Sequence, residues 1–121
     1  MRLFHGTATY NRTPIIQQGL RRYPHHGKIV ACCSVSLEEA GFFALRKTPI
    51  SDLSQTGIVI EFEGNLVQGE FIEIDSRGLL RNEREIAVLN TEKLQPVAVW
   101  KWRRNGWQQE KLIKVKKEIS K

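Results

Sequence analysis

The chain has 121 residues, of which 40% are hydrophobic and 26% charged, with 9 glycines and 4 prolines. This composition excludes a disordered or collagen-like chain and is typical of an ordinary soluble domain, so we expect one domain over residues 1–121. No apolar run approaches the roughly 20 residues of a membrane-spanning helix, and no signal-peptide stretch follows Met1. We therefore expect a cytoplasmic protein without membrane contact, or one delivered to a target-cell cytosol without a signal peptide.

The formal net charge is +6, and the excess lies at the C-terminal end. The first 100 residues hold 11 basic and 11 acidic side chains, whereas the last 21 hold 8 and 2. The three tryptophans lie between residues 100 and 107, and the Asn105-Gly106 turn signal predicts a hairpin over residues 98–117. Two interpretations stay open: a basic aromatic surface for nucleic acid or an acidic protein, or an edge hairpin with core tryptophans and solvated lysines.

Two short helices are predicted in the N-terminal half. After a strand at Leu3-Phe4, Thr13 suits the N-cap, Pro14 the first helical position and Gly19 the stop of a helix that ends near Leu20. A loop over residues 21–28 follows.

A β-type run over residues 29–33 then leads into the second helix. Ser36 and Glu39 have capping-box spacing for a helix through about Lys47.

The remainder of the chain reads as strands. We predict them at residues 58–62, 71–74, 85–89, 97–102 and near 108–117. Helices that come early and strands that come late are typical of an α+β fold with a largely antiparallel sheet.

The cysteines do not predict a metal site. Cys32 and Cys33 are adjacent, and neighbouring strand residues point to opposite faces, so the two are poorly placed to bridge each other or to bind one zinc ion. The nearby His25-His26 pair also lacks the ligand spacing of common zinc sites. We expect two reduced cysteines and no metal.

Three short motifs could bind a ligand or take part in catalysis. The first is His5-Gly6-Thr7, at the end of the opening strand. Gly6 can bring its backbone close to a flat ligand because it has no Cβ, and His5 can form a hydrogen bond with a sugar hydroxyl. A simple turn with a satisfied histidine gives the same pattern.

The second piece joins the predicted strand to the second helix. Ser34 and Ser36 could hold a polar ligand near the positive helix end, although Ser36 could equally be only the N-cap. The 3.6-residue period places Phe43 with the core-facing residues and Phe42 about 100° away. Phe42 is therefore the aromatic ring left for a ligand.

The third piece is a pair of carboxylates, Glu83 and Glu85, at the start of a strand. Their i, i+2 spacing puts both on one face. A carboxylate aimed at a sugar C1 stabilises an oxocarbenium-like transition state and can orient a ribose hydroxyl. An exposed edge strand would carry the same residues.

In this order, the three pieces resemble the ADP-ribosyltransferase superfamily, which includes the catalytic domains of poly(ADP-ribose) polymerases and small bacterial mono-ADP-ribosyltransferase toxins. Residues 3–20 resemble the family's opening, a His-Gly-Ser/Thr strand end followed by a helix and Gly-Leu. Residues 29–44 resemble its second motif, and residues 82–97 its third, in which a glutamate opens a strand. The resemblance implies an α+β fold with a split two-sheet architecture around an NAD-binding cleft, mainly of antiparallel strands. It also implies transfer of ADP-ribose from NAD to a macromolecular target, with release of nicotinamide.

The resemblance also implies roles for individual residues. His5 would bind the adenosine-side ribose, and Gly6 the nicotinamide carboxamide through its backbone, with Thr7 completing that motif. Ser34 or Ser36 would support the nicotinamide ribose. The remaining assignments are Phe42 as a stacking platform, Glu85 as the catalytic glutamate with His5 as the other catalytic residue, and Glu83 on the target side.

The activity expected is mono-ADP-ribosylation of a protein or nucleic acid, because the chain has no obvious room to hold a growing polymer. The biological role (toxin, bacterial or phage effector, or regulator) and the oligomeric state stay open. One alternative is an NAD-consuming RNA 2′-phosphotransferase, which needs a phosphate pocket such as Arg21, Arg22 and Arg81 could form. Another is a non-catalytic module that binds nucleic acid through the basic hairpin.

Overall fold

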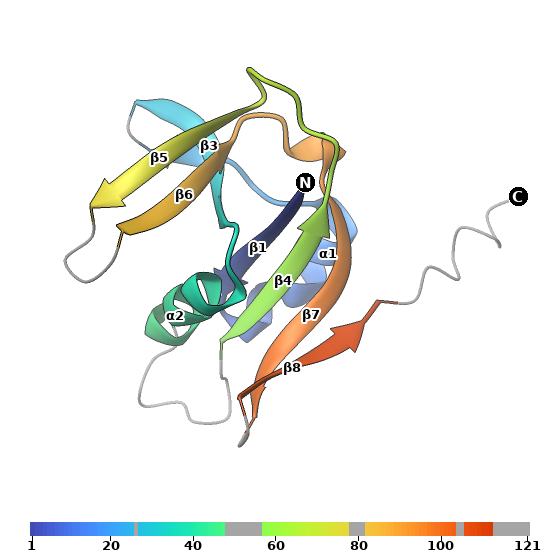
Figure 1. The fold of residues 1–121 in the computed structure, drawn as a ribbon. Coiled ribbons are helices and arrows are strands. Elements are labelled where there is room, and N and C mark those ends of the chain that lie inside the picture. Colours follow the sequence, from blue (N-terminus) through green and yellow to red (C-terminus); the bar gives the residue numbers. More distant parts are fainter. Residues whose placement is uncertain (26, 48–56, 78–81, 104–105, 113–121) are drawn as a thin grey trace, which may run out of the picture.

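The computed structural model describes residues 1–25, 27–47, 57–77, 82–103 and 106–112 (Figure 1). The strands are β1 (Arg2–Thr7), β2 (Tyr23–His25), β3 (Lys28–Ser34), β4 (Ile58–Glu63), β5 (Phe71–Arg77), β6 (Asn82–Val88), β7 (Gln95–Arg103) and β8 (Gly106–Lys111). The helices are α1 (Arg12–Gln18) and α2 (Leu37–Lys47), with 3-10 turns at Thr9–Asn11 and Thr91–Lys93.

Eight strands form one open sheet, in the order β5-β6-β3-β1-β4-β7-β8, with β2 paired to β3 beside this path. Each pairing among the described strands is antiparallel. The expected α+β fold with two separate sheets is therefore wrong: the fold is closer to an all-β architecture with two helices. The reason is the pairing of Phe4 with Ser34, which joins β1 to β3 and makes the two halves continuous.

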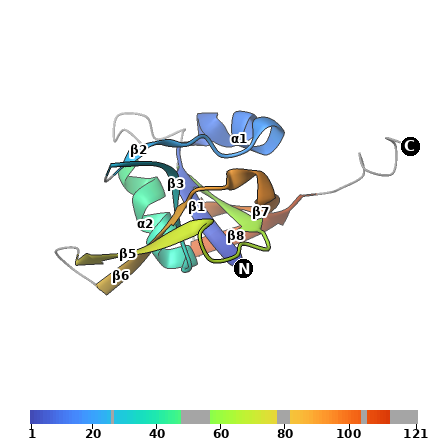
Figure 2. The ribbon, with the colours of Figure 1, turned by 90° about the horizontal axis from the view of Figure 1, so that it is seen from above.

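The two helices cover opposite faces of this sheet (Figures 1 and 2). Ile15 of α1 belongs to the main core, on the face that includes Leu3 and Ile60. Ala40 and Ala44 of α2 pack on Val59 on the other face. Because strand side chains alternate, each face has its own apolar layer.

Small residues let α2 approach the sheet closely. A Cβ added at Gly6 of β1 would lie 1.9 Å from the carbonyl oxygen of Ala40, and one added at Gly57 would lie 2.3 Å from that of Ala44. Farther along the sheet, a Cβ at Gly41 would lie 2.5 Å from the Trp107 ring. These positions require glycine because helix backbone or an aromatic ring fills the space.

Local signals explain most of the first helix, but not its start. Gly19 ends α1 with φ +87°, and its N–H donates to the Ile15 carbonyl at 2.8 Å, as predicted. The expected Thr13 cap is wrong, since α1 begins at Arg12 and Pro14 lies within the first turn. The segment expected to be a loop contains β2, a short edge strand that pairs with β3.

The C-terminal hairpin is present as β7 and β8, with Trp102 opposite Trp107. Trp100 and Trp107 pack against the α2 layer, whereas Trp102 is exposed and contacts Trp107 edge-to-face. The two packed tryptophans agree with the core interpretation of this hairpin. Asn105 of the predicted turn, and residues 113–117 of the predicted strand, lie outside the described residues.

Candidate functional site

The three motif-bearing strands are neighbours in the sheet. β3 lies between β1 and β6, and Ser34 is the Cα partner of both Phe4 and Glu85. Residues from three distant stretches of sequence therefore form one row across three strands. Only the pair Phe4–Ser34 joins β1 to β3, so this junction is the narrowest link in the sheet.

A cavity of about 710 Å³ opens beside this junction, between β1, α1 and the segment that leads into β2. Its volume falls within the range of about 300–1,000 Å³ that is usual for small-molecule sites. The lining residues include His5, Thr7, Asn11, Gln18, Arg21 and Arg22. We call it the His5 cavity.

His5 is fixed in the wall of this cavity. The residue is 5% exposed, and its Nδ1 lies 2.8 Å from the carbonyl oxygen of Cys32 on β3. A carbonyl oxygen only accepts, so Nδ1 carries a proton, and Nε2 is an acceptor when the ring is neutral. Beside it, the Thr7 hydroxyl oxygen accepts a hydrogen bond from Asn11 Nδ2 at 2.9 Å.

Two arginines give the His5 cavity a positive edge. Arg21 and Arg22 are exposed and line it, and Arg22 Nη1 donates to the Leu89 carbonyl at 3.0 Å. None of the described residues that line the cavity is a carboxylate. Tyr23 completes the edge; burial, followed by its cysteine neighbours, raises the pKa of its phenol, which stays protonated at neutral pH. This arrangement suits an anionic ligand such as a phosphate.

Gly6 faces a helix where the sequence analysis placed a ligand. Its missing side chain points to the backbone of α2, at Ala40 and Ala44. Close packing of α2 on β1 therefore explains why glycine stands at position 6, and the backbone contact with nicotinamide stays a prediction.

Ser34 and Ser36 both take part in the start of α2. The Ser36 hydroxyl accepts from the Glu39 N–H at 3.3 Å, which confirms the predicted N-cap, and donates to Glu38 at 3.1 Å. The Ser34 hydroxyl donates to the Glu39 carboxylate at 2.9 Å and accepts from the Ser36 N–H at 3.2 Å. A ribose contact by either serine would have to exchange with these bonds.

The phenylalanines of α2 lie on its exposed side. Phe42 is 44% exposed and Phe43 39%, with their rings edge-to-face at 6.2 Å. The prediction that Phe43 belongs to the core is wrong, because α2 contacts the sheet through a narrow stripe of small residues at Ala40 and Ala44. Phe42 does not line the His5 cavity in the described part of the chain.

Glu85 lies on the face of the sheet opposite to His5. Ile86, the next residue of β6, belongs to the main core, so Glu85 points to the other face. Leu3 also belongs to the main core, and His5, two residues later in β1, points to the same face as Leu3. The Glu85 side chain is 22% exposed, and its Oε1 lies 3.2 Å from His25 Nε2. Among the described residues, neither Glu85 nor Ser34 lines the His5 cavity. Glu83 is in β6, opposite Ser76.

Sequence reasoning missed the contribution of β2. Because residues 21–28 were predicted to be a loop, His25 was not expected to reach Glu85, 60 residues away. The available signal was the alternation of Tyr23 and His25 before Gly27, which has φ +75° in the structure.

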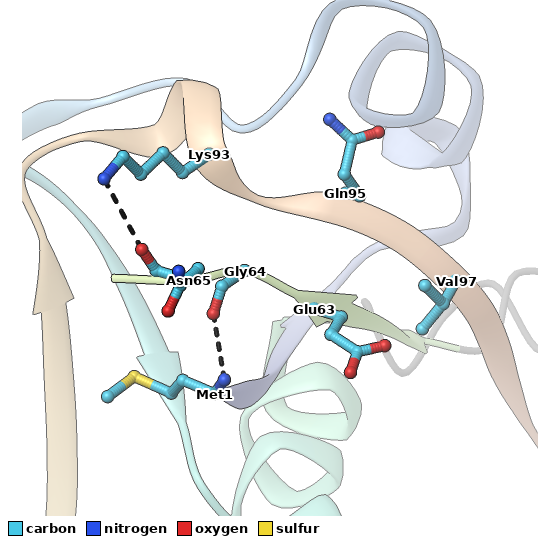
Figure 3. Close-up of a pocket in the computed structure, with 7 residues that line it drawn as sticks. All are labelled: Met1, Glu63, Gly64, Asn65, Lys93, Gln95 and Val97. Atoms are coloured by element: carbon cyan, nitrogen blue, oxygen red, sulfur yellow. Dashed lines mark hydrogen bonds between the residues drawn. The ribbon is translucent and has the colours of Figure 1, made fainter. Parts of the chain in front are cut away.

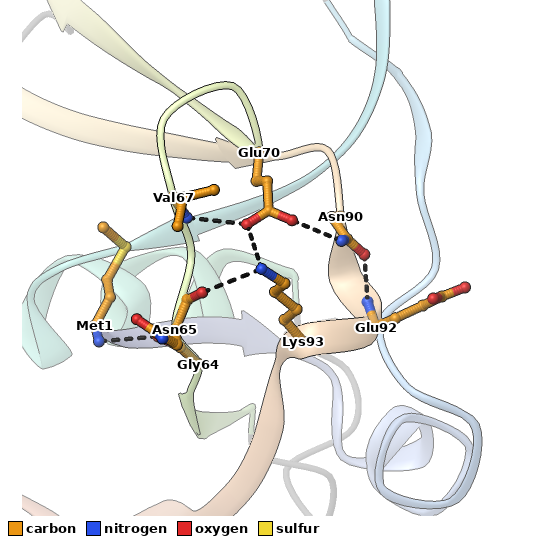
Figure 4. A network of polar contacts seen from close by, with 8 residues as sticks. All are labelled: Met1, Gly64, Asn65, Val67, Glu70, Asn90, Glu92 and Lys93. Atoms are coloured by element: carbon orange, nitrogen blue, oxygen red, sulfur yellow. Dashed lines mark hydrogen bonds and ion pairs between the residues drawn. The ribbon is translucent and has the colours of Figure 1, made fainter.

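A second cavity, of about 350 Å³, lies at the N-terminus and is lined by residues that include Met1, Glu63, Asn65 and Lys93 (Figure 3). Lys93 Nζ donates to the Asn65 carbonyl at 3.4 Å and pairs with Glu70 Oε1 at 2.8 Å (Figure 4). Hydrogen bonds, first from Lys93 and then from the Val67 N–H and Asn90, lower the pKa of Glu70 to about 2. This network ties the turn after β4 to the 3-10 turn before β7, a structural role.

Comparisons of the chain with protein-family models, curated proteins and solved structures find no match. No helix among the described residues is long and apolar enough to cross a membrane. The functional argument therefore depends on the site itself.

Proposed function

We propose that this protein is an NAD-dependent mono-ADP-ribosyltransferase that transfers ADP-ribose to a protein or nucleic-acid target and releases nicotinamide. The observation that carries the proposal is the row formed by β1, β3 and β6, which brings the motifs of His5, Ser34 and Glu85 onto adjacent strands. That adjacency does not follow from the order of the motifs in the sequence.

The His5 cavity would hold the adenosine half of NAD. Nε2 of His5 would accept a hydrogen bond from a ribose hydroxyl, because Nδ1 is already committed to Cys32. Arg21 and Arg22, at the cavity edge, would face the pyrophosphate, which guanidinium groups bind well.

Because Glu85 lies on the other face of the sheet, the nicotinamide half would reach it only if the junction of β1 and β3, held by the Phe4–Ser34 pair, opens. There the carboxylate would stabilise positive charge on C1 of the ribose as the bond from C1 to the nicotinamide nitrogen breaks. A target nucleophile would then bond to C1 and lose its proton. Ser34, a predicted ribose contact, pairs with Glu85 across β3 and β6.

The test is incubation of the purified protein with NAD labelled on the adenylate and a whole-cell extract. We expect label in macromolecules, and protease or nuclease digestion of the product identifies the class of acceptor. A protein that neither labels a target nor releases nicotinamide from NAD would contradict the proposal.

The positive edge of the His5 cavity favours a second candidate, the RNA 2′-phosphotransferase. Arg21 and Arg22 could bind an RNA phosphate as well as a pyrophosphate. Arg81, the third arginine of that alternative, lies outside the described residues. An RNA oligonucleotide with an internal 2′-phosphate would lose this phosphate in an NAD-dependent manner only if the second candidate is correct.

A further inference from the structure

Three side chains with different metal-binding groups meet on one face of the sheet: His25 at the end of β2, Cys32 in β3 and Glu85 in β6 (strands in Figure 2). Their potential ligand atoms all lie within 4.8 Å of one another, and His25 Nε2 lies 3.2 Å from Glu85 Oε1. We call this group the His25-Cys32-Glu85 cluster.

The strand register explains why these three side chains share a face. His25 pairs with Lys28, Ser34 pairs with Glu85, and even-numbered residues of β3 point to one side. Cys32 therefore lies on the side of His25 and Glu85, whereas Cys33 points into the main core. The adjacent cysteines are separated by the sheet, so only one of them can belong to the cluster.

The spacing of the cluster fits a tetrahedral ion. Zinc binds imidazole nitrogen, thiolate sulfur and carboxylate oxygen at about 2.0–2.3 Å, so two ligands on one ion lie about 3.3–3.8 Å apart. The separation of His25 Nε2 from Glu85 Oε1 is already 3.2 Å, and the remaining ligand atoms would move by about 1 Å or less. The three residues come from paired strands, so little backbone order has to be created when an ion binds.

The charges of the cluster also suit a divalent cation. A thiolate and a carboxylate with a neutral imidazole carry two negative charges, which a zinc ion neutralises. All three residues are only partly buried, with the His25 side chain 35% exposed and that of Glu85 22%, so solvent reaches the edge of the cluster, whereas the His25 Nε2 atom itself is buried. Three protein ligands and access to water are typical of sites in which zinc keeps a water molecule in its fourth position.

We propose that His25, Cys32 and Glu85 form a zinc-binding site with water as the fourth ligand. This proposal goes beyond the transferase activity and stands without it, since each ligand is assigned from its place in the sheet. It differs from the expectation from the sequence that the cysteines take part in no metal site, because that expectation considered Cys32 and Cys33 as one pair.

The test uses the full-length protein, reduced and stripped of metal, and titrates it with Co²⁺ as a spectroscopic probe. We expect one equivalent to bind, with a thiolate-to-cobalt charge-transfer band that Zn²⁺ then removes. Cys32→Ser should abolish this band and weaken zinc binding by at least about tenfold. Loss of a residue that only hydrogen-bonds to a metal ligand already costs about 10–100-fold in affinity, so loss of a ligand should cost no less. His25→Gln and Glu85→Gln should each weaken zinc binding as well.

Cys33→Ser is the matched control, because it changes the same type of residue one position away. It should keep the charge-transfer band and the zinc affinity. As a second measurement, zinc should raise the melting temperature of the parent and of Cys33→Ser, but not that of Cys32→Ser. Absence of a thiolate band in the parent, or a band retained by Cys32→Ser, would overturn the proposal. None of these measurements requires NAD, so a failure here is distinguishable from failure of the proposed transferase activity.

Discussion

Replacement of Gly6 by alanine tests the close packing of α2 on β1. The new Cβ would lie 1.9 Å from the Ala40 carbonyl oxygen and 2.9 Å from the Ala44 nitrogen, and contacts under 3.0 Å essentially never occur. Both neighbours are helix backbone, so α2 itself must move outward by about 1 Å or more and open the layer over Val59. Overpacking usually costs about 1–3 kcal/mol, and a clash with backbone places Gly6→Ala near 3 kcal/mol.

Urea unfolding followed by circular dichroism measures this loss, which corresponds to a fall in melting temperature of about 10 °C or more. Gly69→Ala is the control: its Cβ would meet no atom within 4 Å, and its φ of +95° leaves only backbone strain of about 1–2 kcal/mol. A Gly6→Ala protein within about 0.5 kcal/mol of the parent would refute the packing argument. The same data separate loss of fold from loss of a nicotinamide contact at Gly6.

Three further predictions concern charged groups. Arg2→Met should lower the free energy of unfolding in urea by about 2 kcal/mol, because the Glu61 carboxylate, in a residue that is 3% exposed, loses the Arg2 cation at 3.0 Å. The cost stays below the roughly 3–5 kcal/mol of fully buried pairs, since the Arg2 side chain is 55% exposed and Trp100 still donates to Glu61. Glu70→Gln should lower the melting temperature near pH 7, and the difference from the parent should shrink as pH falls from 4.5 to about 2. The reason is that a carboxylate with a lowered pKa stabilises the fold while it is ionised, and this contribution is lost as the carboxylate becomes protonated. If both proposals hold, zinc should inhibit NAD turnover by occupying Glu85, and Cys32→Ser should relieve this inhibition while it keeps the turnover.

Each of these predictions has a result that contradicts it. Unchanged stability of Arg2→Met would mean that water compensates the Glu61 carboxylate. A pH-independent difference for Glu70→Gln would exclude titration of Glu70 as its cause. Zinc inhibition that persists in Cys32→Ser would place the inhibitory ion elsewhere.

Local signals in the sequence predicted most of the secondary structure. The Ser36 cap, the Gly19 stop and the β-type runs that form β4, β6 and β7 depend on neighbouring residues, and all are present. β2 was missed because three residues that include Pro24 become a strand only through pairing with β3. The continuity of the sheet was also beyond local reasoning, since it depends on one pair between Phe4 and Ser34.

The candidate site was predictable by strand but not by face. The strands that carry His5, Ser34 and Glu85 are neighbours in the sheet, but the side on which each residue points follows from the register of β3 with β1 and β6. For the same reason, the sequence could not separate Cys32 from Cys33. His25 and Glu85 are distant in sequence, and only the placement of β2 and β6 on either side of β3 brings them together.

The release of nicotinamide from NAD by the parent and by Glu85→Gln, measured with a metal chelator present, tests the account most directly. Glu73→Gln, an exposed carboxylate on neighbouring β5, is the matched control, and melting curves confirm that each variant is folded. We predict that Glu85→Gln lowers the rate by about 10²–10³, the usual effect of losing one electrostatic stabiliser, and that Glu73→Gln does not. Turnover by folded Glu85→Gln within about threefold of the parent would contradict the role of the β1-β3-β6 row as an NAD site.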